Sequence, residues 1–145
     1  MRKTLTLLTL LICSVSVFAD KVTSTDVKTL PENAQQFIAT YFKDIKIKKI
    51  EVDDAFLEAK VYEVEFVNGY EVEFDSKGNW FQVDFQDDQL PAALIPEKIA
   101  KYIKSNFPGD FITEIEVKKS GYEVELQSDI SIEFDKNQKF KRIDH

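Results

Sequence analysis

The sequence predicts an α+β fold in which a helix followed by antiparallel strands occurs twice in tandem. Two observations support this prediction. Residues 62–66 read Tyr-Glu-Val-Glu-Phe and residues 122–126 read Tyr-Glu-Val-Glu-Leu, so the chain contains an internal repeat. Within each repeat, apolar residues first recur at the spacing of a helix and then alternate as in a strand. We expect about seven to eight strands in an antiparallel sheet, with two helices on one face.

The two repeats differ by one insertion. Near the start of each unit, Pro31 matches Pro96, whereas the strand motif that begins at Tyr62 matches the one at Tyr122. Repeat 1 therefore carries five extra residues between its helix and its Tyr62 strand. We therefore divide the chain after residue 19 into three segments. The lead segment is residues 20–29, repeat 1 is residues 30–85, and repeat 2 is residues 90–145.

The helix expected in each repeat begins at a proline. In residues 31–42 and 96–107 the apolar side chains recur three and four residues apart, which places them on one face of a helix. Proline is favourable at the first helical position because its missing N–H would be unpaired there anyway. Pro108 and Gly109 end the second helix. Each helix therefore has an apolar face that can cover one side of a sheet.

Strand patterns follow each helix. Residues 62–66 and 70–74 alternate apolar side chains with glutamates, which indicates a sheet with one buried and one solvated face. We favour one continuous sheet over two small domains, because a unit of about sixty residues makes a thin core alone. The solvated face is expected to carry these glutamates: Glu63, Glu65, Glu71, Glu73, Glu123, Glu125 and Glu133.

Turn residues separate the strands of the first repeat. Asn68-Gly69 is a strong hairpin signal, and Gly78 suits the positive φ of a second turn. The second repeat has Asp129 and Gln138 in place of the two glycines, so we expect its turns to be built differently.

The first nineteen residues predict a cleaved signal peptide. Arg2 and Lys3 precede an apolar stretch of about thirteen residues, and small residues stand where signal peptidase reads them before a cut after Ala19. The stretch is too short to cross a bilayer comfortably and no second one follows, so no transmembrane segment is expected after cleavage. A lipoprotein signal at Cys13 is the alternative, but Ile12 is not the small residue that lipidation needs. We therefore expect a periplasmic or secreted protein.

Charge and residue content exclude several function classes. Loss of Arg2 and Lys3 with the signal lowers the net charge from −7 to −9. The negative charge argues against nucleic-acid binding, which needs clustered Lys and Arg, and it also disfavours binding to anionic lipid surfaces. Cys13 leaves with the signal, and His145, the only histidine, is the last residue, so Cys-His and Ser-His-Asp arrangements are excluded. We expect a protein that is not an enzyme and needs no cofactor.

No metal site is expected either. Residues 75–79 have oxygen side chains at alternating positions, but Lys77 stands at a middle ligand position. The glutamate that closes an EF-hand loop is also missing, so a hairpin turn explains the segment better than a calcium loop does. Acidic residues near Asp53 and Asp54 could bind a cation weakly, as any acidic loop can.

Two places could contact a partner. Phe56 and Leu57 lie at the expected tip of the inserted loop at residues 53–59, where they either stay exposed for binding or fold back on the sheet edge. Regular alternation would put Trp80 and Gln82 together on the solvated face, where an aromatic side chain can anchor a partner. A β-bulge would instead turn Trp80 into the core. The sequence does not decide between these placements.

Three motifs, taken in order, point to a known family. Asn-Phe-Pro-Gly occupies residues 106–109, the Tyr-Glu-Val-Glu strand occurs twice, and Gly-Asn-Trp occupies residues 78–80. Over about residues 28–144, their order and spacing resemble the PepSY-like family of exported bacterial proteins. That family is also described as similar in fold to the β-lactamase inhibitory protein, which holds its target enzyme on a concave sheet face and two loops. The resemblance implies tandem helix-and-sheet units, an envelope location and no known chemistry.

These observations lead to one functional hypothesis and two alternatives. We expect an exported, non-catalytic binding protein or inhibitor that holds a protein partner of the cell envelope on its exposed sheet face and the loop at residues 53–59. The alternatives are a sensor or carrier of a small ligand or ion, and a structural envelope protein. The resemblance raises the weight of protein binding without naming the target.

Overall fold

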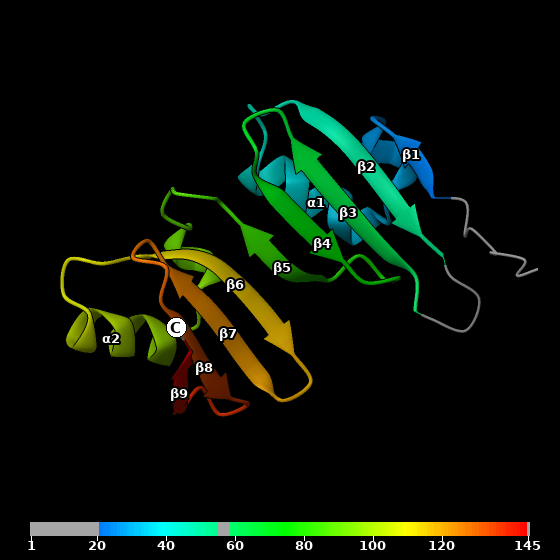
Figure 1. The fold of residues 1–145 in the computed structure, drawn as a ribbon. Coiled ribbons are helices and arrows are strands. Elements are labelled where there is room, and N and C mark those ends of the chain that lie inside the picture. Colours follow the sequence, from blue (N-terminus) through cyan, green and yellow to red (C-terminus); the bar gives the residue numbers. More distant parts are fainter. Residues whose placement is uncertain (1–20, 55–58, 145) are drawn as a thin grey trace, which may run out of the picture.

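The computed structural model describes residues 21–54 and 59–144. Among these residues nine strands form one antiparallel sheet in which every strand pairs with its neighbours in sequence (Figure 1). Two α-helices and two short 3-10 helices complete the fold. In chain order the elements are β1 Val22–Ser24, η1 Val27–Thr29, α1 Glu32–Tyr41, β2 Ile47–Asp53, β3 Val61–Phe66, β4 Glu71–Phe74, β5 Trp80–Asp84, η2 Ala92–Leu94, α2 Glu97–Asn106, β6 Ile112–Lys118, β7 Gly121–Leu126, β8 Ser131–Asp135 and β9 Phe140–Asp144.

The predicted α+β fold and its single sheet are confirmed. A 3-10 helix, an α-helix and four strands occur twice in the same order. The repeats join where β5 pairs with β6, with Val83 opposite Ile115. The sheet has one strand more than expected, because β1 in the lead segment pairs with β2. Three residues are too few to show the alternation by which a strand is recognised in a sequence.

One row of aliphatic side chains crosses the sheet and faces the helices. Its members lie opposite one another from β2 to β8 and are almost completely buried. The row consists of Ile50, Val64, Val72, Val83, Ile115, Val124 and Ile132. Burial of one such side chain contributes about 1.5–3 kcal/mol, so the row is a main source of stability.

Both helices cover this row on the same side of the sheet (Figure 1). Helix α1 buries Ala34 and Ile38, and α2 buries Ile99 and Ile103. Proline precedes the first residue of each helix, close to where the sequence placed it. No helix in the described part of the chain is long and apolar enough to span a membrane.

A β-bulge in each repeat decides where the aromatic residue of the last strand points. Glu73 lies opposite Gln82 but Phe74 lies opposite Trp80, so Phe81 is an extra residue in β5. The bulge turns Trp80 towards the helices, where the centroid of its ring lies 6.0 Å from the ring centroid of Phe37. Of the two placements that the sequence left open, the bulge is therefore right, and the placement of Trp80 on the solvated face is wrong.

The expectation that the second repeat builds its turns differently is also wrong. Asp129 and Gln138 both have φ of 63°, in the left-handed region that Gly69 and Gly78 occupy in repeat 1. Gly78 N–H donates to Asp75 O over 2.9 Å, and Gln138 N–H donates to Asp135 O over the same distance. The turn geometry is therefore conserved between the repeats, and the non-glycine residues carry its strain.

We predict opposite stability changes at the two equivalent turn positions. Gly78→Ala should lower the free energy of unfolding by about 2 kcal/mol, because φ is +80° and a Cβ would meet Ala34 N and Pro31 Cβ at 2.9 Å. Gln138→Gly should raise it by up to about 1 kcal/mol, since glycine relieves the strain. Urea unfolding of both variants measures the changes. Stabilisation by Gly78→Ala would contradict the turn geometry.

Candidate functional site

The face of the sheet away from the helices carries two rows of mainly acidic side chains. Each row runs across the strands because its members lie directly opposite one another. The first row is Glu51, Glu63, Glu73, Gln82, Glu116, Glu123, Glu133 and Arg142. The second row is Lys49, Glu65, Glu71, Asp84, Glu114, Glu125, Ser131 and Asp144. We call this surface the open face. Like charges directly opposite on neighbouring strands repel each other, so this arrangement opposes folding.

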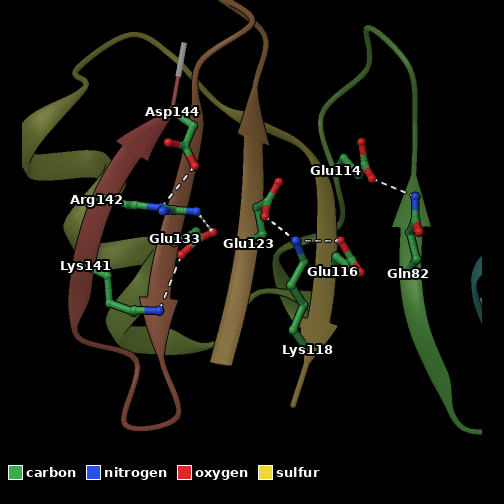
Figure 2. A network of polar contacts seen from close by, with 9 residues as sticks. All are labelled: Gln82, Glu114, Glu116, Lys118, Glu123, Glu133, Lys141, Arg142 and Asp144. Atoms are coloured by element: carbon green, nitrogen blue, oxygen red, sulfur yellow. Dashed lines mark hydrogen bonds and ion pairs between the residues drawn. The ribbon is translucent and has the colours of Figure 1, made fainter. Parts of the chain in front are cut away.

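Cations neutralise the outer parts of the open face. On β2, Lys49 Nζ lies 3.3 Å from Glu51 Oε1 and 3.7 Å from Glu65 Oε2. At the other edge Arg142 Nη2 lies 2.6 Å from Glu133 Oε1 (Figure 2). These partly exposed pairs contribute little individually, but they offset the repulsion along the rows.

Lys118 provides the only ion pairs near the centre of the open face in the described part of the chain. Its ammonium group lies 3.2 Å from Glu116 Oε2 and also contacts Glu123 (Figure 2). Within residues 21–54 and 59–144, the remaining carboxylates of β3 to β7 have no cation within ion-pair distance. We call them the acidic strip: Glu63, Glu71, Glu73, Asp84, Glu114 and Glu125.

Carboxyl groups of the acidic strip have raised pKa values, as expected where negative charges lack nearby cations. Burial, followed by the charges of Asp84, Glu125 and Glu116, raises the pKa of Glu114 to about 7. Gln82 Nε2 donates a hydrogen bond of 2.7 Å to Glu114 Oε1, which lowers the pKa but does not offset the other effects (Figure 2). Near neutral pH this carboxyl group is thus poised between its protonated and ionised forms.

Other carboxyl groups of the strip shift in the same direction. Burial is the largest cause of the raised pKa values of Glu71, Glu73 and Glu125, and neighbouring carboxylates come next. A cation placed over the strip would relieve this repulsion, because opposite charge favours the ionised form. The open face is therefore predisposed to accept positive charge from outside the chain.

A small polar hollow lies at the end of the strip where the two repeats join. Its volume is about 150 Å³, and five carboxylates belong to its lining. The lining residues come from β5, β6, β7 and the turns beside them: Asp84, Gln86, Asp87, Thr113, Glu114, Glu125, Leu126, Gln127 and Asp129. Oxygen atoms predominate among these side chains, so the hollow can bind cations through charge and hydrogen bonds.

The two repeats differ in charge at the hollow. In repeat 1, Lys48 and Lys49 both contact Glu65. In repeat 2 the positions of the two lysines are taken by Thr113 and Glu114, beside Glu125. Repeat 1 thus supplies its own cations, whereas repeat 2 leaves the equivalent place acidic.

The hollow was missed in the sequence analysis, although a signal for it exists. Alignment of the repeats at the offset that relates Pro31 to Pro96 places Lys48-Lys49 against Thr113-Glu114. This alignment shows that positive residues in repeat 1 are replaced by a neutral and a negative residue in repeat 2. It does not show that these residues line a hollow, because only the strand register places Glu114 between Asp84 and Glu125.

The structure separates the residues that the sequence singled out for partner contact. Gln82 lies on the open face and Trp80 on the helix side, so they do not form one contact surface. Phe56 and Leu57 lie outside the described residues, as do His145 and the predicted signal peptide with its cleavage after Ala19.

The connection that carries the inserted residues is longer than its counterpart, as expected. Residues 54–60 join β2 to β3, whereas residues 119–120 join β6 to β7. On the described part of the longer connection, Lys60 Nζ lies 3.5 Å from Asp54 Oδ2. A partner contact by this loop stays a prediction.

Asp75 and Asp135 each accept hydrogen bonds from the backbone of their own turn. Asp75 Oδ1 accepts hydrogen bonds from the N–H groups of Lys77 and Asn79 at 2.8 and 2.9 Å. Asp135 accepts equivalent bonds in repeat 2. The hairpin-turn interpretation of residues 75–79 is thus confirmed. Among the described residues, no group of three or more acidic, histidine or cysteine side chains is arranged to hold a metal ion.

Comparison with known proteins assigns the family. The family model described as "Putative beta-lactamase-inhibitor-like, PepSY-like" matches residues 17–61 and 60–142. The chain belongs to the PepSY-like family. No curated protein matches it.

Three similar solved structures are of proteins from Bacteroides. A protein from Bacteroides vulgatus described as a "putative periplasmic protein of unknown function" has 31% identity and a TM-score of 0.82, and the match covers 86% of this chain and 99% of that protein. A second protein from that species, also described as a "putative periplasmic protein", has 36% identity and a TM-score of 0.81, and the match covers 87% of this chain and 98% of that protein. A protein from Bacteroides thetaiotaomicron described as a "putative calcium-regulated periplasmic protein" has 40% identity and a TM-score of 0.81, covering 87% and 98%.

We predict that Glu114→Gln stabilises this PepSY-like protein above neutral pH. The raised pKa means that the folded state holds a proton which the unfolded chain releases, so stability from this group is lost as pH rises from about 4.5 to about 7. After allowance for partial exposure, the gain should be about 1–2 kcal/mol at about pH 8 and close to zero at about pH 5. Urea unfolding at both pH values measures it.

Glu116→Gln is the matched control two residues away on the same face. It removes the ion pair with Lys118, so it should give no gain at the higher pH. Equal gains in both variants would show that general charge reduction, and not the burial of Glu114, sets the effect.

Proposed function

We propose that this chain is an exported, non-catalytic binding protein of the bacterial cell envelope that holds a basic protein partner on its open face. The hollow between the repeats would accept a lysine or arginine side chain of that partner. The observation that carries the proposal is the difference between the repeats: Lys48 and Lys49 occupy in repeat 1 the place that Thr113 and Glu114 leave acidic in repeat 2.

The charge distribution supports a basic partner. The acidic strip spans five strands, and the raised pKa values of Glu71, Glu73, Glu114 and Glu125 mark it as a place where carboxylates lack counter-charges. Complementary charge across an interface speeds encounter and rejects partners of the wrong sign. Since no preformed cage for a metal ion exists among the described residues, an extended ammonium or guanidinium group is the better fit.

The PepSY-like relatives support the location and the absence of catalysis. The three similar structures named above are each described as a "putative" periplasmic protein, in agreement with the predicted signal peptide. The family description names an inhibitor-like protein and no chemical activity. Binding without chemistry is the function that fits these descriptions, and inhibition of a partner enzyme is one form of it.

Charge reversal at the hollow tests the proposal. Glu114→Lys copies the solution of repeat 1, where Lys49 stands at this position, so the fold should tolerate it. Basic proteins captured from envelope extract by the wild type, and released by salt, should be recovered at least about tenfold less on Glu114→Lys. Glu97→Lys, which makes the same charge change at an exposed position of α2, should capture them as the wild type does.

Two outcomes would contradict a basic partner on the open face. One is equal recovery on Glu114→Lys and on the wild type. The other is a captured protein that salt does not release, because that would indicate an apolar contact surface.

Calcium is the second candidate ligand of the hollow. It prefers oxygen ligands, which the hollow supplies, and the Bacteroides thetaiotaomicron relative is described as calcium-regulated. If calcium binds, CaCl₂ should raise the midpoint of thermal unfolding progressively at constant ionic strength, and Glu125→Gln should weaken the rise. A rise of equal size with NaCl alone would indicate screening of the acidic strip.

A further inference from the structure

We propose that two copies of this chain associate through the outer edge of β9. In the dimer, β9 of one copy pairs antiparallel with β9 of the other, and the two sheets become one. The contact lies at the β9 edge of the sheet, whereas the partner proposed above is held at the hollow between the repeats.

The first argument is the fate of the equivalent strand in repeat 1. Strand β5 corresponds to β9, and its outer edge is occupied by β6. Val83 on β5 is completely buried, whereas Ile143 at the corresponding position of β9 is 37% exposed. Phe140 on the same strand is 42% exposed. The row of aliphatic side chains that crosses the sheet thus ends on an uncovered residue.

At the opposite end of the sheet, the edge of β2 is covered within the chain by β1, a strand of only three residues that forms the sheet edge there. Strand β1 pairs with β2 by placing Ser24 opposite Ile50, just as β5 places Val83 opposite Ile115 on β6. The first strand of each repeat is therefore paired on both sides: β2 with β1 and β3, and β6 with β5 and β7. The last strand of repeat 1, β5, is likewise paired on both sides, by β4 and β6. In the described part of the chain, the last strand of repeat 2, β9, is paired on one side only, by β8.

The bulge in β9 does not block strand addition. Charged residues and bulges at an edge strand often prevent pairing, and Lys141 is both charged and the extra residue here. The equivalent bulge of β5 lies at Phe81, and β6 pairs just beyond it, at residues 82–84. The corresponding stretch of β9 is residues 142–144, which has the same freedom to pair.

Charge selects the partner and the register. An antiparallel pair centred on Ile143 places this residue opposite its own copy and places Arg142 of each copy opposite Asp144 of the other. Within one chain Arg142 Nε already lies 3.2 Å from Asp144 Oδ2, on the open face (Figure 2). The two-fold axis would bring two guanidinium groups and two carboxylates together. A register centred on Arg142 would instead oppose like charges, which is unfavourable.

The strand is therefore self-complementary, as a two-fold symmetric interface requires. Only three residues of each copy pair directly, and the contact is small by the standard of stable dimers. Association is accordingly weak and depends on protein concentration.

Charge exchange tests the proposal. Sedimentation equilibrium of the full protein over a concentration series should show a monomer–dimer equilibrium. Arg142→Asp and Asp144→Arg should each raise the dissociation constant at least about tenfold, because each opposes like charges across the two-fold axis. An equimolar mixture of these two variants should dimerise again, since every pair then joins opposite charges. The double variant Arg142→Asp/Asp144→Arg should also dimerise.

The mixture separates strand pairing from damage to the fold. Arg142→Asp removes the ion pair with Glu133, so circular dichroism and thermal unfolding accompany every variant. A misfolded variant could not regain association by mixing. A wild type that stays monomeric, single variants that still dimerise, or a mixture that stays monomeric would overturn the proposal. Assemblies larger than a dimer would do so too, because they would indicate head-to-tail pairing.

Discussion

Continuous strand register is the constraint on which the rest of this structure depends. Once the aliphatic row from Ile50 to Ile132 is buried beneath α1 and α2, the period of two sends every intervening side chain to the open face. Most of those side chains are carboxylates. The interaction that stabilises the fold therefore also concentrates negative charge on one surface, and the protein has to compensate for it or use it.

The repeats deal with this charge in different ways. Repeat 1 places lysines on β2 beside Glu65, and the outer strand of repeat 2 brings Arg142 to Glu133. At the junction between the repeats, compensation fails, and burial raises the pKa of Glu114 to about 7. Perturbed ionisable groups in a hollow are a common feature of binding sites, because the ligand supplies the missing charge.

The spacing of apolar residues in the sequence predicted most of the fold but not the hollow between the repeats. Helix and strand periods are local, so both helices, the strand pairs and the acidic face could be predicted. Strand β1 was too short to show a period, and its role follows only from pairing with β2. The bulge that turns Trp80 towards Phe37 is invisible to alternation, because one extra residue reverses the face without changing composition. The hollow was not predicted for a related reason. Acidic side chains on a solvated face cannot be told apart in a sequence, and only the strand register shows which of them lie together.

The carboxyl titration of Glu114, followed by the ¹³C NMR shift of its side chain, tests most directly whether the junction carries uncompensated charge. We predict a midpoint near the value of about 7 that burial and the surrounding carboxylates impose. Asp84→Asn should lower that midpoint, since Asp84 is the first of the charges that raise it. A midpoint close to the ordinary value of 4.5, unchanged in Asp84→Asn, would contradict the claim that the carboxylates at the junction lack a compensating cation.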